Sequence, residues 1–98
     1  MLILIYVMKF DEIKNEIVNI SKKNDVNHLY LFGSYAKGLQ TKNSDIDIVI
    51  DGCKDYDKFL DDIDNIMTLT KIDVIDLKKI TNNKYLMEDF NTYAKQIY

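Results

Sequence analysis

Two aspartates, Asp45 and Asp47, stand one residue apart in the stretch SDIDIVID, residues 44–51, where they alternate with isoleucine. Because successive side chains of a strand point to opposite faces, the two carboxylates project together while the isoleucines point into the core. Two carboxylates this close repel each other, and a divalent cation removes that repulsion. Ligands that are all oxygen favour a hard ion, Mg²⁺ or Mn²⁺. The pair is therefore a candidate metal site.

A third carboxylate is expected from a neighbouring strand, and the stretch KIDVIDL, residues 71–77, offers Asp73 and Asp76. Three residues apart in a strand, these two side chains face opposite sides, so only one of them can join the pair. Periodicity alone does not choose between them. Asp73, near the start of the stretch, is the harder one to explain structurally, and it is our preferred third ligand.

The segment FGSYAKG, residues 32–38, follows an apolar strand-like run, and ten residues separate its Gly-Ser pair from the first aspartate. A strand that ends in Gly-Ser and turns into a helix exposes backbone N–H groups beside a hydroxyl, and such groups bind phosphate. Gly33 allows close approach of a ligand, Ser34 supplies the hydroxyl, and Lys37 adds positive charge about one helical turn on. Ser44 either orders the next loop or touches phosphate. A phosphate site beside a carboxylate cluster indicates a nucleoside triphosphate site, in which two metal ions clamp an in-line displacement.

The elements that must position these residues follow from the apolar periodicity. Spacing of three and four residues predicts helices over residues 10–24, 55–69 and 82–97. Runs rich in β-formers or with period two predict strands over 26–32, 44–51 and 71–77. The helical side chains expected to face the core are Phe10, Ile13, Ile17, Ile20, Phe59, Ile63, Ile66, Leu86, Phe90, Tyr93 and Ile97. Strands interleaved with helices predict an α/β (α+β) fold, a small mixed sheet covered by helices.

The chain as a whole limits the class of protein. Its 98 residues predict a single domain over residues 1–98. A net charge of −3 and the absence of arginine argue against direct binding of nucleic acid. The single cysteine, Cys53, is expected to be a small filler residue and fits a reducing, cytoplasmic setting. The opening run MLILIYV is too short to span a membrane, and we expect either an extra edge strand or an upstream extension over residues 1–7.

The Gly-Ser pair, the ten-residue spacer, the D-x-D and a later aspartate on a neighbouring strand resemble the signature of the DNA polymerase β-like nucleotidyltransferase superfamily. The chain is most similar to the minimal nucleotidyltransferases, over residues 10–97. The resemblance implies the nucleotidyltransferase fold, with Asp45 and Asp47 binding catalytic Mg²⁺ and the Gly-Ser turn holding the triphosphate of ATP. The third aspartate precedes an apolar pair in members of this size, which matches Asp73. Lys37 stands where arginine is frequent, and it offers charge without a bidentate fork.

The resemblance also implies a partner. Many minimal nucleotidyltransferases are the antitoxin of a two-gene toxin–antitoxin pair, and the toxin is a helical HEPN-type ribonuclease. The implied reaction is transfer of AMP from ATP to a tyrosine of that toxin, within a hetero-oligomer. Two alternatives are an antitoxin that neutralises by binding alone, and a transferase that acts on a small molecule such as an aminoglycoside. Templated polymerisation is disfavoured by the acidic charge.

Overall fold

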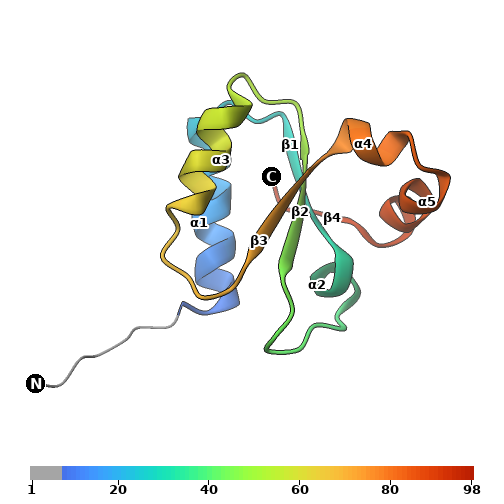
Figure 1. Ribbon diagram of the computed structural model, residues 1–98, viewed down its shortest axis with the longest axis horizontal. Helices are drawn as coiled ribbons and strands as arrows, with labels where there is room; N and C mark the ends of the chain where they lie inside the picture. Colours follow the sequence, from blue (N-terminus) through green and yellow to red (C-terminus); the bar gives the residue numbers. More distant parts are fainter. Residues whose placement is uncertain (1–7) are drawn as a thin grey trace, which may run out of the picture.

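The computed structural model describes residues 8–98, which form a four-stranded sheet in the order β3-β2-β1-β4 with helices on both of its faces (Figure 1). β1 (His28–Phe32) is antiparallel to β2 (Ile46–Asp51), and β2 is parallel to β3 (Ile72–Asp76). β4 (Lys95–Gln96) pairs antiparallel with the other edge of β1. The expected α/β class, a small mixed sheet covered by helices, is confirmed.

The helices divide between the two faces of the sheet. α1 (Phe10–Lys23) and α3 (Tyr56–Asp64) lie side by side on one face, while α4 (Leu77–Thr81) and α5 (Lys84–Tyr93) lie on the other (Figure 1). α2 (Gly33–Lys37) follows β1 directly. Side-chain caps mark the start of α3, α4 and α5, because Asp55, Asp76 and Asn83 accept hydrogen bonds from backbone N–H groups of the first turn.

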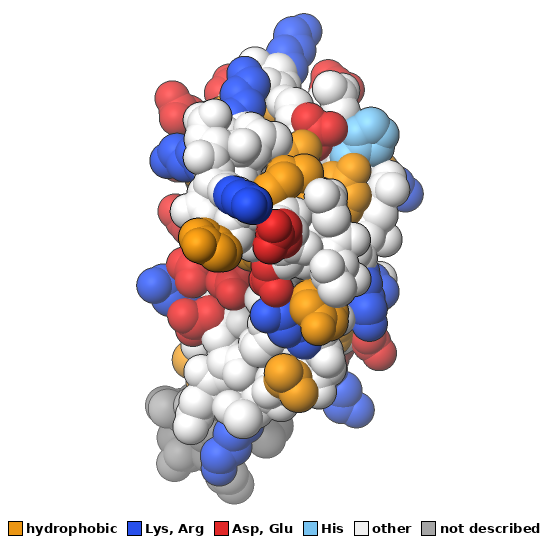
Figure 2. Space-filling view, turned by 90° about the vertical axis from the view of Figure 1, so that its right-hand side faces the viewer, with side chains coloured by type: hydrophobic (Ala, Val, Ile, Leu, Met, Phe, Trp, Pro, Cys, Tyr) orange, Lys and Arg blue, Asp and Glu red, His pale blue; other side chains and the backbone are white. Residues whose placement is uncertain are grey.

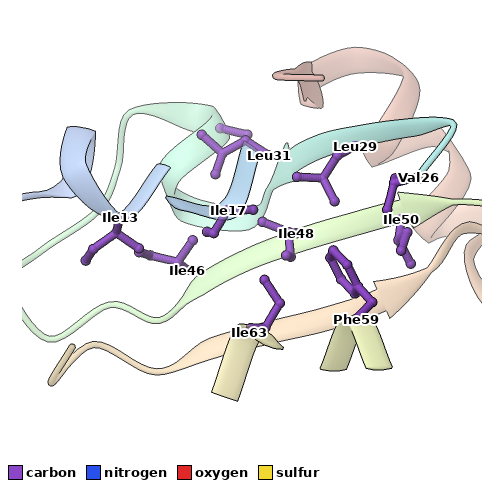
Figure 3. Packing of buried hydrophobic residues seen from close by; sticks show 11 residues of the cluster. Ile13, Ile17, Val26, Leu29, Leu31, Ile46, Ile48, Ile50, Phe59 and Ile63 are labelled. Carbon is purple, nitrogen blue, oxygen red and sulfur yellow. The ribbon is translucent and has the colours of Figure 1, made fainter. Parts of the chain in front are cut away.

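The main core fills the space between the sheet and the pair α1 and α3. Figure 3 shows Phe59 and Ile63 of α3 pointing at Ile48 of β2. The isoleucines that alternate with the aspartates of β2 therefore face inward, as their spacing predicted. The buried members of this cluster are Ile13, Ile17, Val26, Leu29, Leu31, Ala36, Ile46, Ile48, Ile50, Phe59 and Ile63.

The opposite face of the sheet has a much smaller core. Phe32, Val49 and Ile80 are its buried members, and Phe90 packs against them from α5. None of the side chains of α5 is itself fully buried. The prediction that Leu86 and Tyr93 face the core is wrong, since they are 40% and 47% exposed. On the α4–α5 side, Figure 2 shows apolar side chains in separate small groups among charged ones, without one continuous apolar patch.

The tail differs most from its prediction. The single helix predicted over 82–97 is replaced by α5 and β4, because Asn83 caps α5 and the chain leaves helical geometry at Ala94. The backbone of Leu29 supplies the competing interaction: its carbonyl accepts from the Ile97 N–H at 2.9 Å, and its N–H donates to the Tyr98 carbonyl at 3.0 Å. An open edge of β1 therefore outweighs the helical periodicity of the last residues.

Two other expectations concern the bounds of elements. The helix predicted over 55–69 ends at Asp64, and the Thr70 N–H donates instead to the Thr68 hydroxyl at 3.1 Å, a local bond that competes with helix. The extra strand or extension expected over residues 1–7 lies outside the described residues. In the described part of the chain, no helix has the length and apolar character needed to cross a bilayer.

Candidate active site

Asp47 and Asp73 lie directly opposite each other on the parallel strands β2 and β3. Residues paired in register share a face of the sheet, so both carboxylates project to the α4–α5 side, away from the main core. Asp76 lies on the other face and accepts a hydrogen bond from the Lys78 N–H at 2.9 Å as the cap of α4. Periodicity left open whether Asp73 or Asp76 lies near the D-x-D pair, and the structure shows that Asp73 lies beside Asp47. Its role as a metal ligand stays a prediction.

The Gly-Ser turn lies against the same carboxylate. Phe32, the last residue of β1, pairs in register with Asp47, so the next residue emerges beside the Asp47 side chain. Gly33 has a φ of +63°, and a Cβ built on it would collide with the Asp47 carboxylate. Only glycine satisfies both constraints without strain. The two ends of the motif, separated by ten residues, are thus in contact.

The charges around Asp47 are strongly coupled. Burial raises the pKa of the Asp47 carboxyl above its usual value, and the neighbouring carboxylates of Asp73 and Asp45 raise it further. A hydrogen bond between the side chains of Asp47 and Asp73 acts in the same direction, whereas the charge of Lys71 lowers this pKa. Lys71 also forms an ion pair with Asp73 at 3.4 Å. The fold thus forces two carboxylates together, and a bound cation would relieve the repulsion.

Asp45 is more loosely placed than the other two aspartates. It precedes β2 and is exposed, and its charge still reaches Asp47. In residues 8–98 no three Asp, Glu, His or Cys side chains are gathered closely enough to make a ready metal cage. The donor set nevertheless fits a hard cation, since all of its atoms are carboxylate oxygens. The fold supplies a half-buried pair, Asp47 and Asp73, and one exposed carboxylate, Asp45, beside it.

Lys37 sits at the end of α2 and contacts α5. Its amine forms an ion pair with Asp89 at 2.9 Å and lies 5.1 Å from the centre of the Tyr93 ring. The Lys37 side chain is therefore held between α2 and α5, about one turn from the Gly-Ser pair. Ser34 is half-buried, and its hydroxyl makes no hydrogen bond to any other described residue.

Of the two roles expected for Ser44, the structure shows the one in the loop. Its hydroxyl accepts a hydrogen bond from the Thr41 N–H at 2.9 Å, and its own N–H donates to the Thr41 carbonyl at 3.1 Å. Ser44 therefore orders the loop before β2.

His28 begins β1 and lies 3.2 Å from Asp51, at the opposite end of β2 from the candidate site. Cys53 is half-buried and follows the end of β2, as a small filler residue there would.

A family model described as "Polymerase beta, Nucleotidyltransferase" matches residues 15–98. The chain belongs to this nucleotidyltransferase family. The matched region contains the Gly-Ser turn, the D-x-D and Asp73, and so includes every residue of the candidate site. The membership predicted from the motifs is therefore confirmed at the level of the family.

The names of similar proteins refer to the transfer of an adenylyl group to protein. Two proteins of Methanocaldococcus jannaschii named protein adenylyltransferase, MJ1379 and MJ0435, are 36% identical over 70 residues and 43% identical over 44 residues. The first match covers 64% of this chain and 69% of the relative. The second covers 45% of this chain and 47% of the relative, about half the length of that protein.

Solved structures match the nucleotidyltransferase along most of its length. A chain of a toxin–antitoxin crystal structure with AMP-PNP matches with a TM-score of 0.66 and 27% identity, covering 87% of this chain and 72% of that one. A chain of the MntA–HpeT toxin–antitoxin structure with a double Asp→Glu mutation matches with a TM-score of 0.65 and 25% identity, covering 87% and 72%. These matches indicate that this chain has the same fold as the two matched chains.

Sequence reasoning missed two parts of the site. Lys71 stands two residues before Asp73, so the period of two in a strand already places both on one face. That signal was present and could have predicted their ion pair. Asp89 and Tyr93, which hold Lys37, have no local signal, because the contact depends on how α5 packs beside α2.

Proposed function

We propose that the nucleotidyltransferase transfers AMP from ATP to a tyrosine hydroxyl of a HEPN-type ribonuclease toxin and thereby neutralises it. In this proposal the chain is one catalytic domain that acts in the cytoplasm within a hetero-oligomer with its toxin. The observation that carries the proposal is the contact of Gly33 with Asp47, whose register partner is Asp73. A turn suited to phosphate and a pair of carboxylates suited to a metal thus meet at one point.

Each residue has a defined part in this reaction. Asp45, Asp47 and Asp73 would hold Mg²⁺, with two ions in the full site and Mn²⁺ as a substitute, and the cation supplies neutralisation of the phosphate charge. The turn at Gly33 and Ser34 would hold the terminal phosphates. The residues of the chain position the substrate and balance its charge, because phosphoryl transfer leaves little covalent chemistry for the protein.

Lys37 and Ser44 would act on the nucleotide from the edges of the site. The Lys37 amine is paired with Asp89. To bind a phosphate, it must either contact both groups or leave Asp89. Ser44 would act mainly through the loop that it orders before β2.

The comparisons support the class of substrate. The relatives named protein adenylyltransferase point to AMP and to a protein acceptor. The structural neighbours are toxin–antitoxin complexes, one of them with an ATP analogue, which points to a toxin as the acceptor and ATP as the donor. The replaced aspartates in the second neighbour are two positions apart, as Asp45 and Asp47 are.

The test is transfer of label from ATP carrying a labelled α-phosphate, with Mg²⁺ and, as the candidate toxin, the product of the gene adjacent to that of this chain. We expect labelled toxin and loss of its ribonuclease activity with the wild type, and neither with Asp45→Ala/Asp47→Ala. Full neutralisation by that double variant would instead show that binding alone silences the toxin. Label on a small-molecule acceptor and none on protein would also contradict the proposal.

A further inference from the structure

An open pocket of about 420 Å³ lies at the entrance to β2 and β3, lined by residues 42–45 and 69–71. We call it the entrance pocket. Its volume is in the range of pockets that take a small ligand or a few side chains. Asp45 is part of its wall, so the pocket adjoins the candidate active site at that residue.

The order of the strands gives the entrance pocket its place in the reaction. Along the sheet the sequence is β1 with the Gly-Ser turn, then β2 with Asp47, then β3 with Asp73. In an in-line displacement the attacking oxygen and the leaving oxygen stand on opposite sides of the phosphorus. With the leaving phosphates on the Gly-Ser turn of the β1 side, the attacking hydroxyl has to arrive from the β3 side, where residues 69–71 form the pocket wall.

The wall of the entrance pocket contains one apolar side chain, two lysines and, on the side of the candidate active site, the carboxylate of Asp45. Leu69 in its wall is 84% exposed and Met67, two residues earlier, is 88% exposed, the highest values among the large apolar side chains of residues 8–98. Lys42 and Lys71 contribute the positive charge. Lys71 is paired with Asp73, whereas Lys42 forms no ion pair within the described residues.

We infer that the entrance pocket is the docking site for the acceptor segment of the protein substrate, an extended stretch with acidic and apolar side chains next to the modified hydroxyl. This inference rests on the proposed function and adds to it where the acceptor binds and what flanks its hydroxyl. Charge complementarity selects the acidic residues, which pair with Lys42, and the exposed Leu69 and Met67 select the apolar ones. A nucleotide base is the competing occupant of the same pocket.

The experiment compares pocket variants with variants of matched chemistry elsewhere. Leu69→Ser and Lys42→Glu alter the pocket, while Tyr85→Ser, at 81% exposure on α5, and Lys54→Glu, beyond the other end of β2, serve as controls. Two quantities are measured for each variant: the Kd for the candidate toxin, the product of the adjacent gene, without ATP, and the KM values for that toxin and for ATP. Thermal melts check that each variant is folded.

We expect each pocket variant to raise the Kd and the KM for the toxin about tenfold, the effect of losing one contact of a central interface residue. The KM for ATP is expected to stay within about twofold, and both controls to match the wild type. An ATP KM that rises while the toxin Kd is unchanged would overturn the inference and assign the pocket to the nucleotide. Equal weakening by the controls, or no weakening by the pocket variants, would also overturn it. Because Kd is measured without chemistry, tight toxin binding without AMP transfer would contradict the proposed function alone.

Discussion

Among residues 8–98, the face of the sheet under α1 and α3 holds eleven buried side chains in one cluster, whereas the face under α4 and α5 holds three. One strand serves both. In β2 the isoleucines point into the larger cluster, and Asp47, Val49 and Asp51 point to the other face. The period of two allows a single strand to be core on one side and site on the other.

This difference separates what stabilises the fold from what performs the chemistry. Burying apolar area on the α1–α3 face supplies most of the favourable free energy. The α4–α5 face has less apolar packing and contains Asp47, whose pKa is raised by burial and by its acidic neighbours. The comparison therefore predicts that variants on the two faces fail in different ways: loss of stability on one, and loss of transfer on the other.

The largest expected effect comes from Asp47→Asn. Removing a charge that we propose to bind the metal should lower the rate of AMP transfer about a thousandfold, equal to about 4 kcal/mol of transition-state stabilisation. The measurement is the initial rate with labelled ATP. Asp51→Asn is the matched control, since Asp51 lies on the same strand and face but pairs with His28. If the control loses as much activity, the rate does not depend on the Asp47 site.

Phe59→Ala should be the most damaging change on the α1–α3 face. Phe59 is 0% exposed, and its loss should lower the free energy of unfolding by about 3–5 kcal/mol. Phe90→Ala on the other face should cost only about 1–2 kcal/mol, because Phe90 is half-buried and packs against a smaller cluster. Urea unfolding of both variants measures the difference. Equal losses would mean that the two faces stabilise the fold equally.

Gly33→Ala should impair both properties at once. An alanine at a φ of +63° costs about 1–2 kcal/mol of stability, and its Cβ would displace the Asp47 carboxylate. Gly38→Ala is the control, because Gly38 has a φ of +72° and nothing within 4 Å of an added Cβ. We expect similar destabilisation of the two variants in thermal melts, but a loss of transfer for Gly33→Ala alone. Normal transfer by Gly33→Ala would contradict the close contact.

The pH dependence of stability should show the strain at Asp47. The folded-state pKa of Asp47 lies above its ordinary value of 3.8, so the folded state holds this proton more tightly than the unfolded state. The contribution is stabilising below pH 3.8 and is lost as pH rises through the folded-state pKa. Without metal, Asp47→Asn should therefore gain stability relative to the wild type as pH rises from 3.8 toward 7.

Mg²⁺ provides the second half of this measurement. It should raise the Tm of the wild type at pH 7 and have no comparable effect on Asp47→Asn, since binding to the folded state stabilises it by mass action. Parallel unfolding with EDTA and with Mg²⁺ gives both differences. A variant that is less stable than the wild type at pH 7 in EDTA would show that Asp47 is not under repulsion.

The smallest effect is expected from Asp89→Asn, which releases Lys37 from its ion pair. Both side chains are 30% exposed, so the stability should change by less than about 1 kcal/mol. The freed amine should lower the KM for ATP about twofold, equal to about 0.4 kcal/mol, if Lys37 binds phosphate. Steady-state kinetics at varied ATP concentrations measure the change. An unchanged KM would assign Lys37 to packing between α2 and α5 only.

The regions that the sequence predicted well are those in which local pattern and tertiary contacts agree. The alternation around Asp47 sets both the buried isoleucines and the half-buried carboxylates of β2, so the face on which Asp47 lies follows from the sequence alone. The Gly-Ser turn is also local, and its position between a strand and a helix was predicted, with the pair forming the start of α2. The third aspartate could be narrowed to Asp73 or Asp76 from the sequence. The parallel register with β2 then showed that Asp73 lies beside Asp47.

The regions that were missed depend on contacts between distant segments. The last residues have a helical pattern, but the edge of β1 attracts Ile97 and Tyr98 into a strand. The ion pair of Lys37 depends on Asp89, which lies far along the chain. No periodicity in either segment encodes such a partner, because the partner is decided only when α5 packs against the sheet.

The parallel register of β2 and β3 also makes the site a monitor of correct folding. A slip of β3 by one residue would turn Asp73 toward the isoleucine-rich core and point Ile72 and Val74 at the solvent side. A chain folded with that error would bury a carboxylate among isoleucines and would lack the pair opposite Asp47. If the site holds Mg²⁺ as proposed, the stoichiometry of Mg²⁺ binding in a preparation would count the correctly registered molecules, which a measurement of secondary structure alone does not distinguish.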